Sequence, residues 1–171
     1  MRSGKFVGVV VGAYIKTVNV GILLYSAVHS SERRQGIYSN LRSRLLRELN
    51  VDSTNNQQEG NEPRLIDYLI SEVEKDSWLF HKYAKDWGAF VADCDYIQPN
   101  VQGLDSRPMS LVLQPFNVSV PPSKRLLGII VNEMYKHVYR ITNFHLNTRV
   151  NRVVQSFHVS DTEPKPTSPL V

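Results

Sequence analysis

The chain has 171 residues, 42% of them hydrophobic and 21% charged, so it is long enough to bury one core and is not disordered as a whole. Its formal net charge of +4 fits an anionic lipid surface or weak nucleic-acid contact. The single cysteine, Cys94, excludes an internal disulfide framework and a cysteine-cluster metal site.

The most apolar segment runs from Phe6 to Val28 and holds one charge, Lys16. At a rise of about 1.5 Å per residue, a helix of this length would span roughly 34 Å, more than a hydrocarbon core of about 30 Å. No acidic residue precedes Glu32, which is typical of an uncleaved signal anchor or mitochondrial targeting segment. These features predict a transmembrane anchor helix over residues 1–29.

Small and polar residues of this segment fall on one side of the predicted helix. A Gly-x-x-x-Gly spacing allows close approach of a second helix, and polar groups beside it can hydrogen-bond across the contact. The pattern predicts a helix–helix interface formed by Gly8, Gly12, Lys16 and Asn19.

A β-hairpin is the alternative for the same segment, because it is rich in β-branched residues. The strands would be Phe6–Ile15 and Val18–Val28, turning at Lys16-Thr17. Neither half alternates apolar and polar residues, so both strands would need burial on both faces.

An amphipathic helix is expected over residues 30–50, starting near Ser30-Ser31-Glu32. Its apolar positions recur at helical spacing and are Ile37, Leu41, Leu45 and Leu49. Directly after a membrane span, such a helix would lie at the lipid headgroups and contact anionic phospholipid. The residues predicted to make this contact are Arg33, Arg34, Arg44 and Arg47; an ordinary surface helix is the alternative.

The remaining chain divides into a polar loop (51–62), a helical body (63–158) and an extended tail (159–171). Within the body, a helix is expected from Pro63 to about Val91, with a break near Asp76-Ser77. Prolines make residues 93–123 an extended strap or a short hairpin. A last helix, capped by Ser123, would run from Lys124 to about Phe157. The predicted fold class is therefore mostly α.

No motif specifies a chemistry. The sequence has no phosphate-binding or dinucleotide-binding glycine loop and no pair of histidines at metal-ligand spacing, so we expect no catalytic residue, cofactor or metal. Cys94 stands between Asp93 and Asp95, whose charges should raise its thiol pKa and make it a poor nucleophile.

Together these features predict a non-catalytic accessory subunit of a large membrane complex. It would be a single-pass protein of the mitochondrial inner membrane, in the respiratory chain or ATP synthase, that acts in assembly and stabilisation. Its partners would be other membrane subunits, and nucleic acid is not expected. The alternative is a soluble basic structural protein of a ribonucleoprotein complex, with residues 6–28 as buried core strands.

Overall fold

The computed structural model describes residues 4, 6–56, 64–99, 107–141 and 148–158. Its centre is a five-stranded mixed sheet with strand order β1-β2-β3-β7-β4. The strands are β1 Gly8–Ile15, β2 Val20–Val28, β3 Tyr68–Val73, β4 Phe90–Val91 and β7 Ser110–Pro115. Two further short strands, β5 Ile97–Gln98 and β6 Arg107–Pro108, pair with each other.

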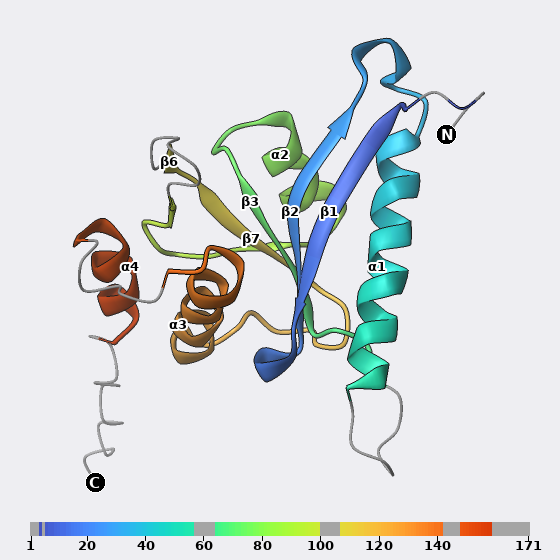
Figure 1. Ribbon diagram of the computed structural model, residues 1–171. Coiled ribbons are helices and arrows are strands. Elements are labelled where there is room, and N and C mark those ends of the chain that lie inside the picture. The colour runs from blue at the N-terminus through green and yellow to red at the C-terminus, as the bar shows by residue number, and fades with distance from the viewer. Residues whose placement is uncertain (1–3, 5, 57–63, 100–106, 142–147, 159–171) are drawn as a thin grey trace, which may run out of the picture.

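Helices cover both faces of the sheet (Figure 1). The helices are α1 Ile37–Asn55, α2 Trp78–Asp86, α3 Lys124–Glu133 and α4 Thr148–His158. α1 and α2 pack on one face, where Leu23, Leu69 and Val73 point. α3 and α4 pack on the other, against alternate residues of the same strands such as Ile22 and Ile70. The molecule is therefore an α/β sandwich of three layers.

The predicted transmembrane helix is wrong, because residues 8–28 form an antiparallel hairpin. β1 and β2 turn at a short 3-10 segment, Lys16–Val18, as the hairpin alternative specified. The first half of β2, Val20–Leu23, tolerates a continuous apolar sequence because it lies inside the sheet, between β1 and β3, and is buried on both faces. Within the described residues, no helix is both long enough and apolar enough to cross a bilayer.

Glycines of the hairpin let α1 lie close to the sheet. A Cβ atom built on Gly12 would lie 2.6 Å from Leu45 Cδ1, and one on Gly21 would lie 2.6 Å from Leu49 Cδ1. Gly8 faces Leu41 in the same way. The leucines that recur along α1 therefore fill the hollows left by these glycines.

β3 lies where the sequence predicted a helix, since its short apolar run fits a buried strand as well as a buried helix. The break near Asp76-Ser77 is present, and Ser77 caps α2 by accepting from Phe80 N. β7 comes from the segment predicted as a strap and pairs with both β3 and β4. These strands replace the predicted helical body, so the mostly α prediction is wrong.

The last predicted helix is shorter than expected. Ser123 caps α3, as predicted, by accepting from Leu126 N. After Glu133 the chain forms one π-helical segment, Met134–Val138, and Arg140 then adopts a left-handed conformation with φ 54°. The predicted tail (159–171) and residues 57–62 of the predicted polar loop lie outside the described residues. The first part of that loop prediction is wrong, because residues 51–55 continue α1.

Candidate functional site at the divergence of two parallel strands

β2 and β3 run parallel but stay paired over only part of their length. Their register extends from Val20–Tyr68 to Leu23–Ser71, after which both strands continue without pairing to each other. Figure 1 shows the two strands separating toward their carboxyl ends. In open α/β sheets, ligands bind at the carboxyl ends of parallel strands, where neighbouring strands part.

A β-bulge marks the point of divergence. Val11 pairs with Tyr25 and Gly12 pairs with Leu23, so Leu24 has no partner on β1. Beyond Leu23, the edge of β2 that faces β3 also lacks ladder hydrogen bonds to β3. Backbone N–H and C=O groups on that edge are therefore available to an extended ligand that carries amides.

The loop that joins β2 to α1 has the features of an anion site. Gly36 precedes the first residue of α1 with φ 74°, and Arg34 has φ 64°. No described side chain caps the helix, and its first turn contains no acidic residue. Free N–H groups and the helix dipole make such an end attractive to phosphate. Arg33 and Arg34 are exposed beside it, and Arg33 Nε donates to Val28 O at 3.3 Å.

A carboxyl group, Glu72, follows directly after Ser71, the last residue of β3 that pairs with β2, and points to the α3 face of the sheet. Tyr96 donates a hydrogen bond to Oε1, and Tyr139 donates one to Oε2. Gln98 Nε2 also donates to Oε2, at 3.0 Å. The π-helical segment brings Tyr135 into the same cluster, where its ring stacks on that of Tyr96 at 5.8 Å.

Burial raises the pKa of Glu72 above its ordinary value of 4.5, although its three hydrogen bonds act in the opposite direction. Burial also raises the pKa of Tyr139, and the Glu72 charge raises it further. No described Lys, Arg or His forms an ion pair with Glu72. A carboxylate that is held by neutral donors and whose pKa is raised above its ordinary value can serve as a proton acceptor.

The four residues predicted to form a helix–helix interface lie in the hairpin. Gly8 and Gly12 face α1, as described above, and Lys16 is exposed in the turn. Asn19 adopts a left-handed conformation with φ 50° and accepts hydrogen bonds from Tyr14 Oη and Ser53 Oγ. The structure therefore does not place them along one helix.

The four arginines predicted to contact lipid headgroups divide into two pairs. Arg33 and Arg34 lie in the loop before α1, and Arg44 and Arg47 are exposed on α1, where they line a groove with Phe6. The structure brings only the first pair to the candidate site. Lipid contact is not tested and stays a prediction.

Sequence reasoning missed Glu72 and Gly36. The signal for Gly36 was a glycine that follows two arginines closely and stands directly before an amphipathic helix. The predicted helix start at Ser30 put Gly36 inside the helix, so its position at the helix end was missed. Glu72 gave little signal, because Ser71 and Glu74 stand beside it at the end of the apolar run. For Cys94 the expectation was right: burial raises its pKa to about 11, and Asp95 and Asp93 add to the effect.

No family model matches the sequence, and no curated protein matches it significantly. Among solved structures, the fold is similar to one described as "Putative acetyltransferase from GNAT family" from Bacteroides thetaiotaomicron, with 16% identity, 83% of this chain and 71% of that chain covered, and a TM-score of 0.54.

Two more partial likenesses are the ribosomal-protein-S18-alanine N-acetyltransferase from Escherichia coli and Arabidopsis thaliana Naa50 in complex with the bisubstrate analogue CoA-Ac-MVNAL. The first has 17% identity, coverage of 72% and 70%, and a TM-score of 0.46. The second has 19% identity, coverage of 64% and 66%, and a TM-score of 0.42.

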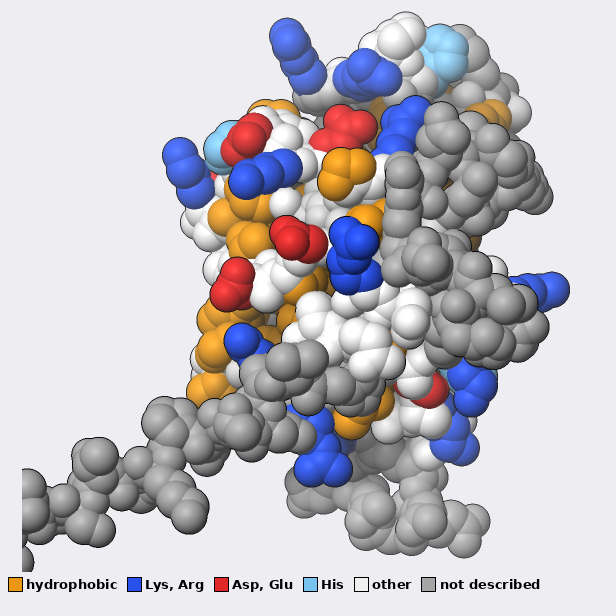
Figure 2. Space-filling view, turned by 90° about the vertical axis from the view of Figure 1, so that its left-hand side faces the viewer, with side chains coloured by type: hydrophobic (Ala, Val, Ile, Leu, Met, Phe, Trp, Pro, Cys, Tyr) orange, Lys and Arg blue, Asp and Glu red, His pale blue; other side chains and the backbone are white. Residues whose placement is uncertain are grey.

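These findings overturn the predicted non-catalytic, single-pass subunit of the mitochondrial inner membrane. Its anchor helix is a strand pair, and the fold is shared with a protein described as an acetyltransferase. The alternative was right about core strands in residues 6–28 but gains no support for a ribonucleoprotein role. On the face shown in Figure 2, the described Lys and Arg side chains are spread among Asp and Glu.

Proposed function

We propose that the protein is an N-acyltransferase that moves an acyl group from a coenzyme A thioester to an amine. The observation that carries this proposal is the pairing of two features at one point of the sheet. An anion site at α1 and free strand edges lie on the β2 side of the divergence, and the proton acceptor Glu72 lies on the β3 side. The likeness in fold supports it.

The chemistry of coenzyme A fits the β2 side. Its diphosphate suits the uncapped end of α1 with Gly36 in a left-handed conformation and Arg33 and Arg34 nearby. Its two amides suit the unpaired edge of β2, which an extended chain can join as a strand would. The thioester would then lie near the bulge at Leu24.

Glu72 is the group that can prepare the amine. An amine is protonated at neutral pH and cannot attack until it loses a proton, and the raised pKa of Glu72 suits that transfer. The amine nitrogen then forms a C–N bond with the thioester carbon as the C–S bond breaks. One ammonium proton goes to Glu72, and the second goes to the departing thiolate. Tyr96, Tyr139 and Gln98 hold the carboxylate in place.

Binding of acetyl-CoA, the simplest donor, tests the proposal by calorimetry. The double variant Arg33→Gln, Arg34→Gln should raise the Kd by about tenfold or more, because hydrogen bonds to phosphate are charge-assisted. The matched control is Arg44→Gln, Arg47→Gln, which removes the same charge from the same region and should change the Kd less than about twofold. Equal losses in both double variants, or no binding by the natural protein, would refute the anion site.

A further inference from the structure

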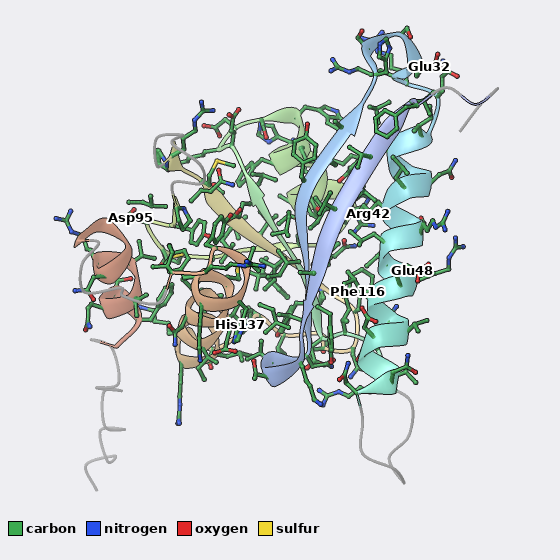
Figure 3. The ribbon with its side chains drawn as sticks, viewed as in Figure 1. Glu32, Arg42, Glu48, Asp95, Phe116 and His137 are labelled. Atoms are coloured by element: carbon green, nitrogen blue, oxygen red, sulfur yellow. The ribbon has the colours of Figure 1, made fainter. Side chains whose placement is uncertain are left out.

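Arg42 is a buried cation on the other face of the same sheet. Its side chain is 8% exposed and reaches from α1 across β3 to β7, where Nη2 donates to the side-chain oxygen of Gln114. The guanidinium lies 4.2 Å from the centroid of the Trp87 ring. Figure 3 shows Arg42 on the side of α1 that faces the sheet.

The polar groups around Arg42 are incompletely satisfied. No described carboxylate forms an ion pair with it, and Arg42 Nε has no hydrogen-bond partner among the described residues. Tyr38, one turn earlier on α1, stacks on Trp87 at 6.3 Å, and its buried hydroxyl lies beside the Tyr83 hydroxyl without a hydrogen bond of ordinary geometry. A guanidinium removed from water is costly unless an anion accepts its hydrogen bonds.

The position of this pair relative to the anion site suggests what completes it. Tyr38 and Arg42 lie in the first two turns of α1, on the side that faces the sheet and α2, directly beyond the loop at Gly36. Both side chains therefore lie on the sheet side of the same helix end that would bind the phosphates.

We propose that Arg42 and Tyr38 bind the carboxylate of the transferred acyl group, so that the preferred donor is the coenzyme A thioester of a short dicarboxylic acid. This inference rests on the function proposed above. Arg42 offers a planar fork that matches a carboxylate, and the Tyr38 hydroxyl adds a third donor. The Gln114 side-chain oxygen, a neutral acceptor, marks the place that one carboxylate oxygen takes.

Calorimetric titration with succinyl-CoA and with acetyl-CoA tests this preference. The natural protein should bind succinyl-CoA about tenfold more tightly or better, because only its carboxylate reaches Arg42. Arg42→Met should abolish the preference, leave the Kd for acetyl-CoA within about threefold, and not lower the Tm, since it removes a buried charge that has no counter-ion. Arg44→Met, on the exposed side of α1, is the control and should keep the preference.

A purely structural role for Arg42 gives a different result: Arg42→Met would lower the Tm and weaken both thioesters equally. Tyr38→Phe keeps the ring stack and removes only the hydroxyl, so it should weaken succinyl-CoA alone by about threefold or more. Equal affinity of the natural protein for the two thioesters would overturn the donor preference and leave the acyltransferase intact. Binding of neither thioester would overturn both.

Discussion

Two charged side chains, the buried Arg42 and the half-buried Glu72, lie on opposite faces of one sheet, and their surroundings differ. Glu72 receives hydrogen bonds from Tyr96, Tyr139 and Gln98, so its site is complete without a ligand. Arg42 has one neutral acceptor and aromatic rings, and its Nε has no partner among the described residues. The comparison indicates that Glu72 is a preorganised base on the α3 face. It also indicates that Arg42, on the α1 face, is a binding group whose hydrogen bonds are completed only when an anion binds.

The largest effect should come from Glu72→Gln, which removes the proton acceptor and keeps the shape of the side chain. We expect kcat/KM for acyl transfer to fall by about 10²- to 10⁴-fold, the usual contribution of a general base, with the Kd for acetyl-CoA little changed. Thiol release gives the rate. Glu74→Gln makes the same charge change two residues later at an exposed position and should leave the rate unchanged. Similar rates in both variants would exclude Glu72 as the base.

Gly12→Ala tests how the α1 face is packed. The new methyl group would lie 2.6 Å from Leu45 Cδ1 and 2.7 Å from Ile22 O, so the free energy of unfolding should fall by about 1–3 kcal/mol. Urea denaturation measures the loss. Val11→Ala, on an exposed side chain of the same strand, should cost less. If Gly12→Ala costs no more than that control, α1 does not approach the hairpin as described.

Tyr139→Phe tests whether the donors around Glu72 tune its titration. Losing one hydrogen bond to the charged form should raise the pKa of Glu72 further and cost about 1 kcal/mol of stability. The rate of acyl transfer falls as pH drops through this pKa, so the acid side of the pH–rate profile should move to higher pH in Tyr139→Phe. An unchanged pH–rate profile in this variant would contradict the assignment of Glu72 as the base.

The raised pKa of Glu72 also makes the free energy of unfolding depend on pH. Because the folded protein holds the Glu72 proton more tightly than the unfolded chain, this contribution is full below pH about 4.5 and declines as pH rises through the raised pKa. Glu72→Gln should lack this decline. Unfolding free energies of both proteins between pH 4 and 8 measure the difference, and parallel curves would refute it.

The smallest effect should come from Lys16→Leu, which changes neither face of the sheet. Lys16 is exposed in the turn between β1 and β2, so the free energy of unfolding should change by less than about 0.5 kcal/mol. Chemical denaturation again measures it. A loss of several kcal/mol would mean that Lys16 makes a contact that the hairpin does not show.

Local signals allowed several elements to be predicted from sequence. The leucines from Leu41 to Leu49 indicated α1, and Ser77 and Ser123 indicated the caps of α2 and α3. The hairpin was ambiguous, since an apolar run without alternation fits a membrane helix as well as two strands buried on both faces. Its position inside the sheet depends on β3, which lies far along the chain.

The candidate site was harder to predict, because it depends on contacts between distant residues. Glu72 is 24 residues from Tyr96 and 67 residues from Tyr139, so nothing local connects them. The divergence of β2 and β3 depends on where pairing ends, which no residue type specifies. Only Gly36, a glycine directly before a helix, could have been read from its neighbours.

The most direct test of the central claim is to map acetyl-CoA binding on the ¹⁵N-labelled protein by NMR. The account predicts that the largest amide shifts fall on residues 36–39 at the start of α1 and on residues 24–28 of β2, the two segments that offer free backbone groups. Shifts centred on the opposite ends of these strands, or no shifts at millimolar acetyl-CoA, would contradict it.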